Sequence, residues 1–148
     1  MSGAESDVTA PRRPDVDGNE GDRPDVLMVY SVKNLAKIER HVMPLARTAN
    51  VTMVCIDADE SVEGIDYVTV PSFGFRPLSL FLMFVAALVE AWRGEYDAVA
   101  SFSLVPNGCI ALAVGTLFRL PTHLGIIGID LDVHAQARYG PLVRALVR

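Results

Sequence analysis

The stretch that decides the fold runs from residue 96 to residue 134 and reads YDAVASFSLVPNGCIALAVGTLFRLPTHLGIIGIDLDVH. An apolar run over 98–102 is followed by a polar break over 103–108 and an Ala/Gly/Leu segment over 109–118. A second apolar run, 123–127, comes after the stop signal formed by Arg119 and Pro121. Two short strands joined by a helix of about three turns form a βαβ unit, whose crossover is almost always right-handed.

Polar side chains follow both predicted strands. Ser103 and Asn107 come after the first strand, and Asp130, Asp132 and His134 come after the second. In open parallel sheets, ligands bind at the carboxyl ends of the strands. We therefore expect these five side chains to share one rim, and this rim is the candidate site.

The rest of the chain continues the alternation of strands and helices. The pattern predicts strands over 26–32, 51–56 and 67–70, a helix over 35–49 that is kinked at Pro44, and an apolar helix over 73–92. Asn34 is the expected N-cap of the first helix, and Pro77 and Gly94 mark the start and end of the second. Five strands alternating with helices predict an α/β fold: a Rossmann-like parallel sheet with helices on both faces. The charged face of the first helix is expected to be solvated and carries Lys37, Arg40, His41 and Arg47.

Composition narrows the class of protein. Residues 1–24 are acidic and rich in Pro and Gly, which predicts a disordered tail before a folded domain over 25–148. The net charge of −5, without a basic cluster, argues against nucleic-acid binding. Two Lys against 11 Arg indicate either a halophile or a GC-rich genome. Cys55 and Cys109 have no CxxC partner, so we interpret both as reduced packing residues of a cytoplasmic protein without a leader peptide and without a metal site.

The apolar helix has two open interpretations. Its apolar run over 78–89 is about 12 residues long, whereas a membrane span needs about 20. The helix is therefore either buried against the sheet or partly facing lipid. Phe73, Phe75 and Arg76, just before it, form an aromatic and cationic lip of the kind found at membrane interfaces, which predicts peripheral contact with the inner membrane face.

Two motifs in this order suggest a family. Glu39-Arg40-His41-Val42 with Leu45-Ala46 resembles the E-R-H-V-x-x-L-A helix of family 4 glycosyltransferases, which have the two-domain GT-B fold. The segment 128–132, GIDLD, resembles that family's loop after the fifth strand, commonly H-G-x-D. Over residues 25–148 the chain is similar to the amino-terminal, acceptor-binding domain of that architecture. The chain departs from the family pattern at two places. The family's glycine pair is replaced by Leu35-Ala36 or Ala36-Lys37, depending on the alignment, and Ile127 stands where the family has His.

The resemblance implies half of a retaining glycosyltransferase that transfers a sugar to a lipid-linked or cell-surface glycan. The nucleotide-sugar donor belongs to a second domain that the sequence lacks, so this chain is expected to hold no cofactor itself and to need a donor-binding domain or chain as its partner. The last predicted helix, over 133–148, ends on an apolar pattern. The chain is therefore expected to be either truncated or one chain of a split enzyme. With this resemblance, Asp130 is the candidate catalytic residue, and Ser103, Asn107, Gly128, Asp132 and Arg40 are candidates for acceptor binding. The family's His role is not carried over, and His134 is a second catalytic candidate only because it lies four residues after Asp130.

Structural roles compete with each of these assignments. Asp130 and Asp132 are also suitable helix N-caps, and Ser and Asn at a strand-to-helix turn often form only local hydrogen bonds. Arg40 and His134 are also compatible with solvated helix faces. Two other functions therefore stay open: a non-catalytic α/β binding module at the membrane surface, and an unrelated flavodoxin-like or receiver-like domain. The YSVK sequence of residues 30–33 argues against a receiver, which needs paired acidic residues there.

Overall fold

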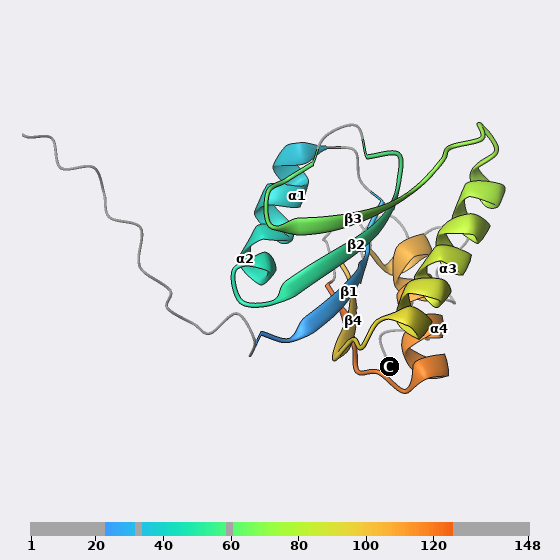
Figure 1. Ribbon diagram of the computed structural model, residues 1–148. Helices are drawn as coiled ribbons and strands as arrows, with labels where there is room; N and C mark the ends of the chain where they lie inside the picture. The colour runs from blue at the N-terminus through green and yellow to red at the C-terminus, as the bar shows by residue number, and fades with distance from the viewer. Residues whose placement is uncertain (1–22, 32–33, 59–60, 126–148) are drawn as a thin grey trace, which may run out of the picture.

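The computed structural model describes residues 23–31, 34–58 and 61–125. Its centre is a five-stranded sheet in the order β3-β2-β1-β4-β5, in which every neighbouring pair is parallel (Figure 1). The predicted α/β Rossmann-like fold is thus confirmed. The strands are β1 (Asp25–Val29), β2 (Asn50–Ile56), β3 (Ile65–Val70), β4 (Ala98–Ser101) and β5 (Thr122–Leu124).

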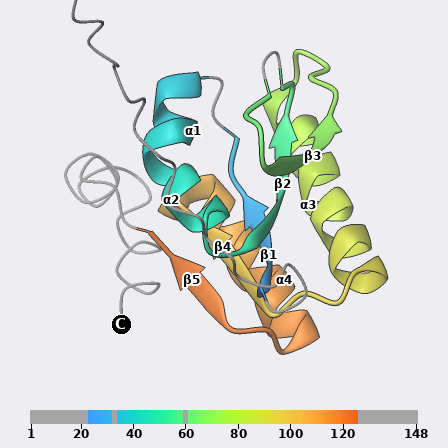
Figure 2. The same cartoon turned by 60° about the vertical axis from the view of Figure 1, so that its left-hand side comes forward.

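Helices cover both faces of the sheet, as Figure 2 shows from the side. On one face, α1 (Leu35–His41) and α2 (Met43–Ala46) pack on β1 and β2 through Ile38 and Val42. On the other face, α3 (Arg76–Arg93) and α4 (Cys109–Phe118) pack on the sheet. The two apolar cores lie on opposite sides of β1, the central strand.

Strand β1 shows why the sheet is buried on both sides. Leu27 and Val29 point into the core under α3 and α4, whereas Val26 and Met28 point into the core under α1 and α2. Successive side chains of a strand alternate between the faces, so a strand covered on both faces is continuously apolar. The VLMV sequence of residues 26–29 meets this requirement.

The predicted kink of the first helix is confirmed as a break. Helix α1 ends at His41, Val42 is its C-cap, and α2 begins at Met43 with Pro44 in its first turn. A proline inside a helix removes a hydrogen bond and clashes with the preceding turn, whereas it is tolerated at a helix start. Asn34 occupies the N-cap position, but its side chain makes no capping bond; its backbone carbonyl accepts from the amides of Lys37 and Ile38.

The ends of several elements differ from the sequence prediction. Helix α3 begins at Arg76, and Pro77, the predicted start, lies in its first turn. Residues 73–75 precede the helix, because Gly74 has φ of 73° and Phe75 is extended. Strand β3 starts at Ile65, two residues earlier than predicted, because it pairs with β2 from Val51 onward. Helix α4 has the predicted bounds, and Arg119 closes it in the left-handed conformation with φ of 57°.

Glycine at position 115 lets α4 approach β5. A Cβ at this position would overlap with the side-chain oxygen of Thr122 and approach the carbonyl oxygen of Leu120 to 3.1 Å. The amide of Leu120 donates to the carbonyl of Gly115, which fixes the turn between the helix and the strand. The predicted tail within residues 1–22 and the predicted helix over 133–148 lie outside the described residues.

Candidate functional site

The switch point of the sheet lies between β1 and β4. These strands are neighbours, but the chain leaves β1 toward α1 on one face and leaves β4 toward α4 on the other. In open α/β sheets, the crevice at the carboxyl ends of two such strands is where ligands bind. The segment after β4, which includes Ser103 and Asn107, begins at this point.

Two serines hold the backbone of this segment. The hydroxyl of Ser101 donates to the carbonyl of Ser103 over 3.2 Å, and the hydroxyl of Ser103 donates to the carbonyl of Val105 over 3.3 Å. A short helical turn, η2 (Leu104–Gly108), follows and contains the cis peptide bond Val105–Pro106. Its last residue must be small, because a Cβ on Gly108 would lie 2.6 Å from the carbonyl oxygen of Ser103. Ser103 therefore acts first as a local hydrogen-bond donor that shapes the loop.

Asn107 is the unusual residue of this turn. Its side chain is only 5% exposed, and its Oδ1 atom is buried with no hydrogen-bond partner among the described residues. Buried polar groups are nearly always paired, since an unpaired one forfeits the hydrogen bonds that it made to water. Asn107 directly precedes Gly108, the N-cap of α4, and that helix start has no side-chain cap either.

Aromatic rings line the other side of the switch point. The rings of Tyr30 and Phe102 meet edge to face, with centroids 6.1 Å apart, and the rings of Phe102 and His41 lie 5.7 Å apart. The β1–β4 register explains the first contact, because Met28 pairs with Ala100 and the two rings follow two residues later on each strand. The prediction that His41 belongs to the solvated face of the first helix is wrong, because this ring is half-buried against Phe102.

This ring cluster was not predicted from the sequence. No motif marks Tyr30, Phe102 and His41, and the signal that finds them is strand pairing, which depends on knowing that β1 lies beside β4. Arg40, by contrast, is exposed on α1 as a solvated side chain would be. Within the described ranges, no hydrogen bond or ion pair joins Arg40 to Ser103 or Asn107.

The remaining predicted site residues cannot be placed. Gly128, Asp130, Asp132 and His134 all lie outside the described residues. The structure therefore places Ser103 and Asn107 on one segment. That they share a rim with Asp130, Asp132 and His134 stays a prediction.

A hollow of about 520 Å³ lies on the α1–α2 face, beside the switch point. It extends over β1, β4 and β5, and Phe102 forms part of its wall. Its walls are mostly apolar, and the polar residues among those that line it are Ser101, Thr48 and His123. The lining residues are Pro24, Val26, Leu45, Thr48, Ala49, Ala98, Ala100, Ser101, Phe102, His123, Leu124 and Gly125.

Both cysteines are free thiols, as the sequence analysis expected. Burial, with a smaller contribution from the nearby Asp57 carboxylate, raises the pKa of the Cys55 thiol to about 11. Burial also raises the pKa of Cys109. A raised pKa keeps a thiol protonated and unreactive at neutral pH, so neither residue is an activated nucleophile.

The described part of the chain has neither a metal-binding cluster nor a membrane-spanning helix. There, no three His, Cys, Asp or Glu side chains are grouped so that they could hold a metal ion. Among the same residues, no helix has the length and apolar character needed to span a bilayer.

Comparison with known proteins gives neither a matching family model nor a matching curated protein. The resemblance to family 4 glycosyltransferases therefore rests on the motifs of the sequence, and the fold is the property that the structure adds to it.

Proposed function

We propose that this chain is the acceptor-binding half of a glycosyltransferase, completed by a donor-binding domain or chain. The observation that carries the proposal is the buried, unpartnered Oδ1 of Asn107 at the switch point of a parallel sheet. An amide oxygen that lacks an internal partner is suited to a ligand rich in hydroxyl groups, because a hydroxyl can donate a hydrogen bond to it.

The surroundings of Asn107 support a sugar as that ligand. The half-buried rings of Phe102 and His41 lie at the same end of the sheet, and the buried ring of Tyr30 supports Phe102 from inside. The Ser101 and Ser103 hydroxyls fix the loop that carries Asn107. Ligand sites of this kind combine apolar walls with a few fixed polar groups that set orientation. A pyranose ring, with apolar C–H faces and polar edges, matches both properties.

The proposed division of labour follows from what the described residues lack. No nucleophile–base pair is found among them: both thiols have raised pKa values, and the Ser101 and Ser103 hydroxyls donate to backbone carbonyls. In this proposal the chain binds and orients the acceptor, Asp130 and His134 stay the candidate catalytic residues, and the donor half supplies the nucleotide-sugar.

A transfer assay with the two halves tests the proposal. The full chain is co-expressed with a candidate donor-binding partner, and sugar transfer from UDP- and GDP-sugars to a glycan acceptor is measured. We expect transfer with both halves present and none with either half alone, and Asn107→Leu should reduce transfer mainly through a higher acceptor KM. Unchanged kinetics for Asn107→Leu in an active pair would remove Asn107 from the site.

The alternative function, a non-catalytic binding module at the membrane surface, is favoured by one observation. Phe73 and Phe75 are 59% and 63% exposed, and Arg76 beside them is exposed as well. Exposed aromatic rings next to a cation are typical of segments that insert into the interface of a membrane. Vesicle flotation of the chain separates this function from the first one.

A further inference from the structure

The outer face of α3 is entirely apolar. Between Pro77 and Arg93, every exposed residue has an apolar side chain, and Trp92 and Phe81 are 83% and 60% exposed. Surface helices normally turn charged and polar residues to solvent, and a helix that is apolar all round is normally buried. The opposite face is packed on the sheet through Ser79, Met83, Ala87 and Ala91. We call the exposed set the outer stripe; it consists of Leu78, Phe81, Val85, Val89 and Trp92.

The spacing of the outer stripe is symmetric. Successive members are three, four, four and three residues apart, so the pattern reads the same in both directions from Val85. With 3.6 residues per turn, the five side chains fall within an arc of about 80°. Spacings of three and four residues keep all five side chains on one side of the helix, as a surface that packs on a second helix requires.

We propose that the outer stripe pairs with the outer stripe of a second copy of this chain, with the two α3 helices antiparallel and a two-fold axis at Val85. A two-fold interface brings the same patch of both subunits together, so it must be self-complementary. In this arrangement Leu78 faces Trp92 of the second copy, and Phe81 faces its Val89. Each large ring is thereby matched with a smaller side chain.

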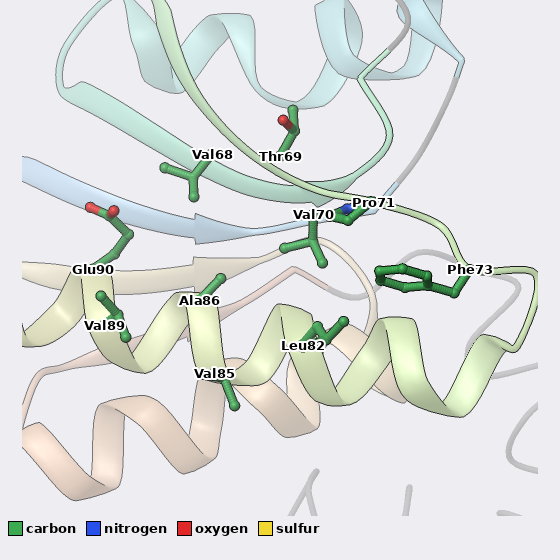
Figure 3. A pocket seen from close by; sticks show the side chains of 10 residues that line it. All are labelled: Val68, Thr69, Val70, Pro71, Phe73, Leu82, Val85, Ala86, Val89 and Glu90. Atoms are coloured by element: carbon green, nitrogen blue, oxygen red, sulfur yellow. The ribbon is translucent and has the colours of Figure 1, made fainter.

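A hollow beside the stripe can receive projecting rings of the second copy. It has a volume of about 440 Å³ and lies between α3 and the edge strand β3, as Figure 3 shows. Val85 and Val89 belong both to the stripe and to the walls of this hollow, and Phe73 closes one end. One surface therefore carries projections and a recess side by side, which a self-complementary interface requires. The other lining residues are Val68, Thr69, Val70, Pro71, Leu82, Ala86 and Glu90.

The charges of α3 argue against a lipid surface as the partner of the outer stripe. In the antiparallel pair Arg76 of one copy lies level with Gly94 of the other, between its Arg93 and its Glu95, so charges of both signs meet at each end of the pair. Helices that lie on membranes carry many Lys and Arg residues on their polar face. The charged residues of α3 are only Arg76, Glu90 and Arg93, in a chain of net charge −5.

The size of the stripe indicates a reversible dimer. Typical aromatic and aliphatic side-chain areas give on the order of 500 Å² of exposed stripe surface per copy. Specific interfaces bury about 800 Å² per partner, so residues beside the stripe must contribute the remainder. Small interfaces are typical of transient pairs, so we expect monomer and dimer to be in measurable equilibrium.

Sedimentation equilibrium of the full chain, from about 5 to about 500 μM, measures that equilibrium. We expect the dimer fraction of the wild type to rise over this range. Val85→Glu should stay monomeric, because it brings two like charges together at the axis. The matched control is Leu117→Glu on α4, where the replaced side chain is 66% exposed but lies outside the stripe, and it should dimerise like the wild type. Circular dichroism melts verify that both variants are folded.

Cysteine cross-linking tests the antiparallel geometry. Two cysteines form a disulfide only when their Cα atoms come within about 7 Å. Val85→Cys, at the axis, should cross-link to its own counterpart under mild oxidation. Val89→Cys should not, since the two residues lie about 12 Å apart along the helices in an antiparallel pair. The wild type, with Cys55 and Cys109, gives the background rate.

Three results would overturn the proposal. The first is a wild-type protein that stays monomeric up to the highest concentration. If that monomer floats on phosphatidylglycerol vesicles and the Val85→Glu variant does not, the stripe binds lipid instead. The second is a dimer that Val85→Glu and Leu117→Glu weaken equally. The third is cross-linking of Val89→Cys as fast as that of Val85→Cys, which indicates a parallel pair.

Discussion

Replacing Asn107 by leucine should make the protein more stable. Leucine has the same number of side-chain heavy atoms and the same branch point as asparagine, but it has no polar atom. In the structure, Oδ1 of Asn107 is buried without a partner among the described residues. Removing an unpaired buried polar group recovers its desolvation cost, which is about 1–3 kcal/mol.

The expected gain is measurable by urea and thermal unfolding. A gain of about 1–3 kcal/mol in the free energy of unfolding shifts the midpoint of thermal unfolding upward by roughly 3–5 °C per kcal/mol for a domain of this size. The control is Asn50→Leu at an exposed asparagine whose side-chain amide donates to Asp25 over 3.0 Å. Exposed substitutions of this kind change stability by only about 0.5 kcal/mol or less.

The same variant should bind acceptor less well, which links the stability measurement to function. A residue that costs stability and serves a ligand is the usual trade-off at a binding site. If Asn107→Leu is instead less stable than the wild type by more than about 1 kcal/mol, Oδ1 has a partner in solution, such as an ordered water, and the reasoning fails.

Three further predictions concern other parts of the molecule. Gly115→Ala should destabilise by about 1–3 kcal/mol in urea unfolding, because the added methyl group overlaps with Thr122, whereas Gly to Ala in a free helix stabilises. The free energy of unfolding of the wild type should be highest below the ordinary thiol pKa of 9.0 and should fall by up to about 3 kcal/mol as the pH rises toward the folded pKa of about 11. Cys55→Val should remove this fall, which unfolding curves at several pH values between 9 and 11 would show. Phe73→Ser with Phe75→Ser should weaken vesicle binding by roughly 2–4 kcal/mol in flotation assays if both rings insert.

Each of these has a control and a contrary outcome. For position 115 the control is Thr116→Ala, exposed on the same helix, and a Gly115→Ala variant as stable as the wild type would show that α4 shifts away from β5 at little cost. For Cys55, an unchanged pH slope in the Val variant assigns the alkaline loss of stability to other groups. For the rings, equal flotation of variant and wild type means that they are ordinary loop residues.

The fold was largely predictable, because the spacing of apolar residues indicates the type of each element and the turn residues mark where it ends. Helix α4 matched its predicted bounds, since Gly108 and Arg119 bracket an uninterrupted apolar segment. The break at Pro44 was also predictable, because proline cannot continue a helix. The ends of the strands were less predictable. Ile65 belongs to β3 because it pairs with β2, and strand pairing depends on tertiary structure rather than on the local sequence.

The site was predictable only in part. Ser103 and Asn107 were identified from their place after a strand, but their different roles depend on which backbone groups the loop brings within reach. The ring cluster at His41 depends on strand order, which a single sequence does not show. The outer stripe was visible as apolar letters over 78–92, yet only the burial of Met83 and Ala87 reveals which side of the helix is left uncovered.

The central claim, acceptor binding at the switch point, is tested most directly by nuclear magnetic resonance. The side-chain amide signals of the ¹⁵N-labelled full chain are followed during titration with mannose and N-acetylglucosamine oligosaccharides, and separately with UDP-glucose and GDP-mannose. The account predicts that an oligosaccharide shifts the Asn107 amide signal, that Asn107→Leu abolishes saturable binding, and that the nucleotide-sugars leave the signal unchanged. Micromolar binding of a nucleotide-sugar by the chain alone, or an Asn107 signal that no oligosaccharide moves, would contradict it.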